Sequence, residues 1–302
     1  MTAPPKLTIA AAQYPIERLA NLSALKAKLT RWAEDASRRA ADLLVFPEYG
    51  AMEIAGTCAD AIASDLTASL AAVAERLPEI DAHHADLARR LGLHILAASG
   101  PTRKGDRTYV NAARLFTPAG PIGVQEKLIM TPFEQRWGIS PGEHLSVFET
   151  ALGPLGVLIC YDSEFPLLAR ALAEAGARLI LVPSCTERLS GYHRVRTGAM
   201  ARALENSIVT VQSPTVGEAL WSPAVDRNAG AAGIYVPAEA GVSDTGVVAE
   251  GKLDTATLVL GTVDLAALDR VVSSGEMRNR RDWALQPGAT ALLPLARCVD
   301  LR

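Results

Sequence analysis

The stretch GVLICYDSEFP, residues 156–166, decides the expected fold. It begins as a short apolar run, turns at Cys160, and continues into a helix expected over 166–175 with a proline in its first turn. A short and continuous apolar run is typical of a strand buried on both faces of a sheet. A buried strand that leads into a helix predicts an α/β protein with parallel or mixed strands.

The same alternation of strand and helix continues on both sides of this stretch. Helices are expected over 22–40, with Asn21 as N-cap, and over 194–206. A third helix is expected over 66–91, with an interruption near Pro78. No repeat or linker divides the chain, which predicts one domain over 1–302 with residues 273–302 as a C-terminal arm. Further strands are expected at 43–46, 94–98, 109–116, 179–182, 207–212, 233–236 and 257–263.

Composition and charge indicate the class of protein. Hydrophobic residues make up 49% of the chain, enough for a sizeable core. Thirty Lys and Arg residues against 33 Asp and Glu residues give a net charge of -3, which offers nucleic acid or an anionic membrane no electrostatic attraction. No apolar run is long enough to span a membrane, and residues 1–5 lack the basic region and apolar run expected of a secretory signal. We therefore expect a cytoplasmic protein without nucleic-acid or membrane partners.

The cysteines offer no metal site by their spacing. Cys58, Cys160, Cys185 and Cys298 form no CxxC pair, and disulfides are rare in the cytoplasm. A cysteine taken without context is most often a small buried apolar residue. Its place in the fold must therefore single out any reactive thiol.

Two strand ends carry chemically active side chains. The run LLVF, residues 43–46, leads into Pro47 and Glu48, and the run GVLI leads into Cys160. Because the carboxyl ends of parallel strands open into the binding crevice of an α/β sheet, Glu48 and Cys160 are expected in one crevice. A carboxylate at the end of a buried strand is costly unless it is paired, which favours a functional role for Glu48.

A third segment, QEKLIMTPFEQRWGISPG at residues 125–142, carries Lys127 and Glu134. Its prolines and glycines predict a long loop, and long loops in compact domains are often functional. By itself, however, a charged residue in a loop is usually solvated.

Together these segments resemble the nitrilase superfamily of carbon–nitrogen hydrolases. The matching motifs are FPE at 46–48, EK at 126–127, CYDSEFP at 160–166, RALEN at 202–206 and RNRRDW at 278–283. The resemblance implies an αββα sandwich, in which two mixed sheets pack face to face with helices outside. It also implies a homodimer or larger homo-oligomer, and a reaction that needs no metal or other cofactor.

The resemblance also implies the role of each residue. Cys160 would be the nucleophile, and it needs a base because a free thiol is mostly protonated near neutral pH. Glu48 would be that base. Lys127 would stabilise the oxyanion together with the N–H of Tyr161, and Glu134 would position Lys127 or the substrate.

Two further residues are expected near the substrate. The pair Tyr161–Asp162 resembles the amidase branches, whereas Asp162 could instead cap the helix that starts near Phe165. Cys185 follows the strand at 179–182 and either lines the pocket or fills space.

The expected function is hydrolysis of an amide bond in a small molecule, through a thioester on Cys160. Nitrile hydrolysis and acyl transfer to an amine remain alternatives on the same scaffold. Another enzyme hypothesis is a Cys–His hydrolase that pairs Cys160 with His193 or His144. A non-catalytic binding protein is the alternative from a different class. The substrate stays open because residues 218–251 lack the Gly-x-Ser element common in the family.

Overall fold

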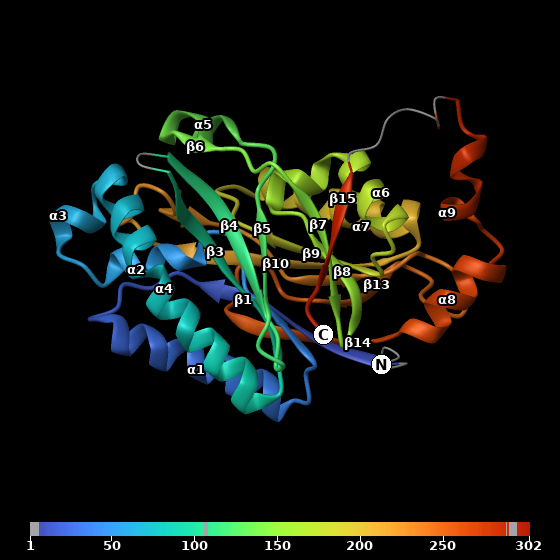
Figure 1. Cartoon of the computed structure of the whole chain (residues 1–302), viewed down its shortest axis with the longest axis horizontal. Coiled ribbons are helices and arrows are strands. Elements are labelled where there is room, and N and C mark those ends of the chain that lie inside the picture. The colour runs from blue at the N-terminus through green and yellow to red at the C-terminus, as the bar shows by residue number, and fades with distance from the viewer. Residues whose placement is uncertain (1–5, 106–107, 288, 290–294) are drawn as a thin grey trace.

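The strands form one hydrogen-bonded sheet that folds back on itself into two packed halves (Figure 1). The computed structural model describes residues 6–105, 108–287, 289 and 295–302. The strands are β1 (Lys6–Pro15), β2 (Leu43–Val45), β3 (His94–Lys104), β4 (Thr108–Phe116), β5 (Ile122–Glu126), β6 (Ile139–Ser140), β7 (Leu145–Thr150), β8 (Gly153–Val157), β9 (Leu179–Ser184), β10 (Val209–Glu218), β11 (Arg227–Asn228), β12 (Gly233–Tyr235), β13 (Val247–Glu250), β14 (Thr257–Asp264) and β15 (Ala296–Asp300).

Helices cover the outer faces of the two halves. The α-helices are α1 (Leu22–Arg38), α2 (Glu53–Gly56), α3 (Asp60–Ala63), α4 (Leu66–Leu91), α5 (Pro132–Trp137), α6 (Pro166–Glu174), α7 (Leu189–Asn206), α8 (Leu265–Ser274) and α9 (Asn279–Asp282). Short 3-10 helices are η1 (Gly50–Met52), η2 (Cys160–Glu164) and η3 (Trp283–Leu285). In Figure 1, α1 and α4 lie on the opposite side of the molecule from α6 and α7.

Each half of the sheet is mixed. In the first half, β1, β2 and β3 are parallel, whereas β14, β4 and β5 join antiparallel. In the second half, β8, β9 and β10 are parallel, whereas β7 and β12 join antiparallel. The halves connect where β1 and β10 pair through Tyr14–Thr215 and Pro15–Val216. The two mixed sheets of the expected sandwich are therefore present, joined at one corner.

Alternation along β1 shows how the layers pack. Ile9 and Ala11 belong to the core cluster that also contains Leu155 of β8. Ala10 and Ala12 belong to the cluster that contains residues of α1 and α4. Successive side chains of a strand point to opposite faces, so one face of β1 meets the other sheet and the other face meets helices. The αββα order of layers follows.

Most elements expected from periodicity are confirmed. α1 ends at Arg38, and Asn21 caps it as predicted by accepting a hydrogen bond from Ala24 N at 2.9 Å. α7 begins at Leu189, earlier than predicted. The predicted interruption at Pro78 is wrong, because α4 runs through it without a break. A proline inside a helix costs about 3 kcal/mol, and the buried apolar face of α4 offsets that cost.

The C-terminal segment is more ordered than its sequence pattern indicates. It contains α9 and η3, and β15 then pairs in parallel with β7 at the sheet edge. Leu301, next to this strand, is buried and lies close to Gly123 of β5. Residues 288 and 290–294 of the expected arm lie outside the described residues.

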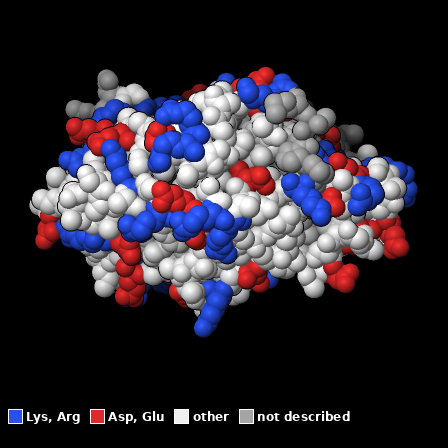
Figure 2. Space-filling view, turned by 90° about the horizontal axis from the view of Figure 1, so that it is seen from below, with Lys and Arg blue, Asp and Glu red and all other residues white. Residues whose placement is uncertain are grey.

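The face seen in Figure 2 carries both signs of charge. Lys and Arg side chains lie beside Asp and Glu side chains across it. Surface ion pairs on α1 and α4, such as Arg38–Asp35 and Arg90–Asp86, show the same mixing. Within the described part of the chain, every helix is too short or too polar to cross a bilayer.

Candidate active site

Three strand ends from both halves of the sandwich meet at one place. Glu48 follows β2 in the first half, while Cys160 follows β8 and Cys185 follows β9 in the second half. The backbone N–H of Cys185 donates to Oε2 of Glu48 at 3.0 Å. The Cys160 thiol faces the carbonyl oxygen of Cys185 at 3.8 Å. Glu48 and Cys160 therefore share one crevice.

The backbone is strained at Cys160, the predicted nucleophile. Cys160 has a φ of 49°, in the left-handed region that non-glycine residues seldom occupy. The turn is held from two sides: Ser163 Oγ donates to the carbonyl oxygen of Cys160 at 2.7 Å, and α7 packs directly against it. A Cβ on Gly198 of α7 would lie 2.9 Å from the carbonyl oxygen of Ser163, so glycine permits this close approach.

A lysine lies between two carboxylates at the centre of the site. Lys127 Nζ donates to Glu48 Oε1 at 2.7 Å and to Glu134 Oε2 at 2.6 Å. The three side chains are at most 2% exposed. Burial of this kind is tolerable only because the cation offsets both anions.

Glu134 comes from a helix that the sequence analysis predicted as loop. α5 begins with a capping box, in which Thr131 Oγ1 accepts from Glu134 N while Glu134 Oε2 accepts from Thr131 N. Pro132 occupies the first turn. The pattern Thr-Pro-Phe-Glu carries this signal, since a Thr three residues before a Glu marks a helix start. The expected long loop is therefore wrong in this part.

Two residues at the site were not predicted. Asn111 on β4 is fully buried, and its Nδ2 lies 3.0 Å from Glu48 Oε1 and 3.2 Å from Glu134 Oε1. Tyr49, directly after Glu48, donates from its hydroxyl to Glu134 Oε1 at 2.9 Å. Neither residue type is distinctive within a strand or turn, so only the fold identifies them.

The two glutamates differ in their acidity. Burial raises the pKa of Glu48, and the nearby Lys127 offsets this only in part. Burial would also raise the pKa of Glu134, but Lys127 and Thr131 outweigh it, so that the pKa is lowered. Burial opposes the charge on Lys127, yet the two carboxylates raise the pKa of its amine. Glu48 is therefore the carboxylate in this group that is poised to take up a proton.

The surroundings of the Cys160 thiol favour its protonated form. Burial raises its pKa well above the ordinary value, and the negative charge of Glu48 acts in the same direction. A hydrogen bond from the thiol in turn lowers the pKa of Glu48. The geometry therefore suits removal of the proton by Glu48 during attack, not a thiolate formed in advance.

Tyr161 and Cys185, two further predicted site residues, lie next to this centre. Tyr161 is the second residue of η2, and an N–H in the first turn of a helix has no partner within it. Burial raises the pKa of the Cys185 thiol to about 12, and this thiol contacts Asn228 Oδ1 at 3.3 Å.

The Asp162 carboxylate points into the backbone beneath the site. It accepts hydrogen bonds from the N–H groups of Leu128, Ile129 and Ile159, at 3.2, 2.8 and 3.3 Å. It therefore ties the segment after Lys127 to the turn that contains Cys160. α6, which starts after Phe165, has no side-chain cap.

The two histidines of the alternative hypothesis are exposed. His193 on α7 contacts the Tyr192 ring, and His144 lies 3.9 Å from Glu143. The groups that act on the Cys160 thiol are instead Glu48, Lys127 and the Cys185 backbone.

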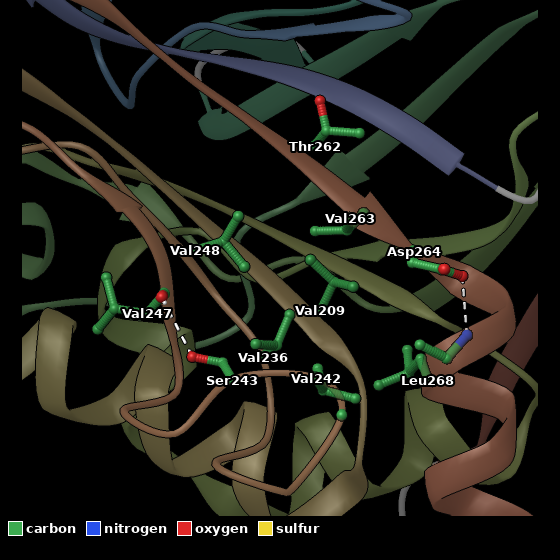
Figure 3. A pocket seen from close by; sticks show the side chains of 12 residues that line it. Val209, Val236, Val242, Ser243, Val247, Val248, Thr262, Val263, Asp264 and Leu268 are labelled. Carbon is green, nitrogen blue, oxygen red and sulfur yellow. Dashed lines mark hydrogen bonds between the residues drawn. The ribbon is translucent and has the colours of Figure 1, made fainter.

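A cavity of about 290 Å³ lies away from this centre (Figure 3). Its lining includes Val209, which pairs with Leu179 at the opposite end of β9 from Cys185. Its polar groups already have partners: Ser243 donates to the carbonyl oxygen of Val247, and Asp264 caps α8. Among the described residues, no group of three or more His, Cys, Asp or Glu could hold a metal ion.

Comparison with known proteins places the chain in a family. The chain is 34% identical over 273 residues to the probable hydrolase YhcX of Bacillus subtilis. The aligned region covers 89% of this chain and 52% of that protein. It is 30% identical over 156 residues to the omega-amidase NIT2 of Xenopus tropicalis, covering 48% of this chain and 56% of that protein. The chain thus spans about half the length of these curated relatives.

Solved structures show the same fold. Nit3 of Saccharomyces cerevisiae, a member of branch 10 of the nitrilase superfamily, matches with a TM-score of 0.69 at 19% identity, over 93% of this chain and all of that one. A carbon–nitrogen hydrolase from Helicobacter pylori matches with a TM-score of 0.72 at 19% identity, over 89% and 92% of the two chains. The family model described as carbon-nitrogen hydrolase matches residues 8–268. The chain therefore belongs to the carbon–nitrogen hydrolases of the nitrilase superfamily.

Proposed function

We propose that this protein hydrolyses the amide bond of a small molecule through a thioester on Cys160. Glu48 is the general base, Lys127 and the N–H of Tyr161 stabilise the oxyanion, and Glu134 holds Lys127 in place. The observation that carries the proposal is the bridging position of Lys127, 2.7 Å from Glu48 and 2.6 Å from Glu134 in the crevice that contains the Cys160 thiol.

In the first half-reaction, Sγ of Cys160 bonds to the amide carbon while Glu48 takes the thiol proton. The carbonyl oxygen becomes negative. Lys127 has three N–H groups, of which two are donated to the glutamates, so the third is left for this oxygen. When the tetrahedral intermediate collapses, the C–N bond breaks and Glu48 returns the proton to the leaving amine.

In the second half-reaction, water replaces the amine. Glu48 is again ionised and takes a proton from water as its oxygen attacks the thioester carbon. The C–S bond then breaks, the proton returns to Cys160, and the carboxylic acid leaves. The raised pKa of Glu48, caused by burial, suits a group that must gain and lose a proton twice in each turnover.

The names of the relatives support amides as the substrate class. They include the omega-amidase NIT2 and a deaminated glutathione amidase of Yersinia enterocolitica, 32% identical over 144 residues. Within the described residues, the free cysteines agree with a cytoplasmic location, which we also propose.

The test measures ammonia release from a panel of small amides, nitriles and ureido acids. Wild type should release ammonia from amides, Cys160→Ala should not, and Cys298→Ala, which changes an exposed cysteine far along the chain, should match wild type. Intact mass should show an acyl adduct that is lost in Cys160→Ala. Release that survives in Cys160→Ala would refute the nucleophile assignment.

The same panel separates the alternatives. Acid formed from nitriles but not from amides would indicate a nitrilase. Acyl transfer to added hydroxylamine in place of hydrolysis would indicate a transferase. A wild-type protein that forms no adduct with any compound would indicate a binding protein. Loss of Cys160 reactivity in His193→Ala or His144→Ala, with Glu48→Gln unaffected, would favour the Cys–His scheme.

A further inference from the structure

Asn111 is a buried amide at the catalytic centre. It belongs to β4, where it pairs with Pro101 of β3, and its carbonyl oxygen accepts from Lys127 N at 2.8 Å. This backbone hydrogen bond places Asn111 next to the start of the segment that carries Lys127. The amide Nδ2 then lies 3.0 Å from Glu48 and 3.2 Å from Glu134, in each case from Oε1.

The contacts divide the two oxygens of Glu48 into different roles. Oε1 accepts from Lys127 Nζ and from Asn111 Nδ2, and a carboxylate oxygen accepts about two hydrogen bonds. Oε2 accepts from the backbone N–H of Cys185 and retains one position. Oε2 is therefore the less occupied oxygen of Glu48 and the one with more room to receive a proton from Cys160.

Glu134 is fully occupied as an acceptor. Its Oε1 accepts from Tyr49 and Asn111, and its Oε2 accepts from Lys127 and from both donors of Thr131. Two buried carboxylates around one cation would ordinarily compete for a proton. Asn111 presents N–H groups to the Oε1 atoms of both, so it removes the oxygens on which a shared proton could lie.

We propose that Asn111 is a positioning residue, which confines proton transfer to the Oε2 atom of Glu48 that serves Cys160. This inference rests on the proposed function, because it assigns the atom that carries out the proposed base step. Asn111 touches no substrate in this scheme and acts through Glu48.

Removing the amide has a consequence that loss of packing alone would not have. A carboxylate that loses a donor becomes harder to ionise, so the pKa of Glu48 would rise. The base must be ionised to work, and the acid limb of the Cys160 reactivity profile therefore moves to higher pH. Loss of one hydrogen bond to the charged carboxylate should raise the pKa of Glu48, and with it the midpoint of the acid limb, by about one pH unit.

The experiment follows alkylation of Cys160 by iodoacetamide against pH, read by intact mass. The variants are Asn111→Leu, which has a similar size but no donor, and the smaller Asn111→Ala, which also lacks a donor, in case the first does not fold. Asn206→Leu is the matched control, because Asn206 is also fully buried and its Nδ2 donates, among the described residues, to the carbonyl oxygen of Arg202 at 3.1 Å and to no carboxylate.

We expect the acid limb to move up by about one pH unit in the Asn111 variants and to stay in place in Asn206→Leu. Slower alkylation at every pH with an unmoved midpoint would overturn the inference and leave Asn111 a packing residue. Alkylation needs no amide substrate, so this outcome is distinct from failure of the proposed function. That failure would appear as an identical profile for wild type and Glu48→Gln.

Discussion

Gly198→Ala tests how far the proposed reaction depends on the position of η2, the turn that contains Cys160. The new methyl group would lie 2.9 Å from the carbonyl oxygen of Ser163 and 3.3 Å from its carbonyl carbon. Both are backbone atoms, which cannot rotate away as a side chain could. Ordinary contact begins near about 3.4 Å, so η2 or α7 must move by a few tenths of an ångström.

The effect on activity should exceed the effect on stability. Overpacking costs about 1–3 kcal/mol, and alanine recovers about 1 kcal/mol of helix propensity relative to glycine. The net loss of about 2 kcal/mol or less leaves a domain of ordinary stability folded. A misplacement of about 1 Å can reduce a rate about 100-fold, so the smaller shift here predicts about a tenfold loss of kcat/KM.

The assay compares kcat/KM, Cys160 alkylation and the melting temperature in wild type, Gly198→Ala and Gly191→Ala. Gly191 is the control on the same helix: its methyl group would lie 3.0 Å from Cβ of Thr186, a side-chain atom that does not belong to η2. We expect a smaller loss of activity there. Equal losses in both variants, or unchanged kcat/KM in Gly198→Ala, would refute the reasoning.

Three further predictions concern the charges of the site and the assembly. Lys127→Met should lower kcat/KM by about 100-fold or more and should also lower the melting temperature, because two buried carboxylates lose their cation; an unchanged melting temperature would contradict this. Burial raises the pKa of Asp162 to about 7, above the value of about 3.9 expected in the unfolded chain. As the pH rises, Asp162 therefore ionises first in the unfolded state, and the free energy of unfolding should fall as the pH increases from about 4 to about 7. Urea titrations should find a shallower fall in Asp162→Asn, and an equal slope would count against the role of this carboxyl. Met277 and Leu285 are 62% and 80% exposed on the C-terminal segment. If this arm joins protomers of the homo-oligomer that the family resemblance implies, changing both residues to Ser should lower the mass found by sedimentation, whereas an unchanged mass would exclude that role for them.

The pattern of apolar residues predicted those helices and strands that can be identified from their local sequence alone. α1 carries an apolar stripe and a capping asparagine, and β9 is a continuous apolar run, so both could be identified locally. β1 could not be identified in this way, because both of its faces are buried and its alanines carry no period. The break predicted at Pro78 is wrong because the burial of the apolar face of α4 outweighs the local cost of a proline inside a helix.

Residues of the site could be predicted from the sequence only where they follow a strand that the sequence itself identifies. Glu48 and Cys160 could be placed in one crevice because each follows an apolar run. Asn111 could not, because an asparagine inside a strand has no distinctive spacing, and its role arises from the approach of β2 and α5 to β4. Contacts of this kind depend on the packing of segments far apart in the chain.

The two glutamates show how such packing gives one residue type two functions. Glu134 receives five hydrogen bonds, three of them from the capping residue Thr131 and from Lys127, and these hold its pKa low against the effect of burial. Glu48 accepts fewer hydrogen bonds although its side chain is equally buried, so the effect of burial prevails and its pKa is raised. A lysine between two equivalent carboxylates would leave the base undefined. In the proposed mechanism the capping box of α5 resolves this, because it favours the ionised form of Glu134 and leaves Glu48 as the group that would exchange protons with Cys160.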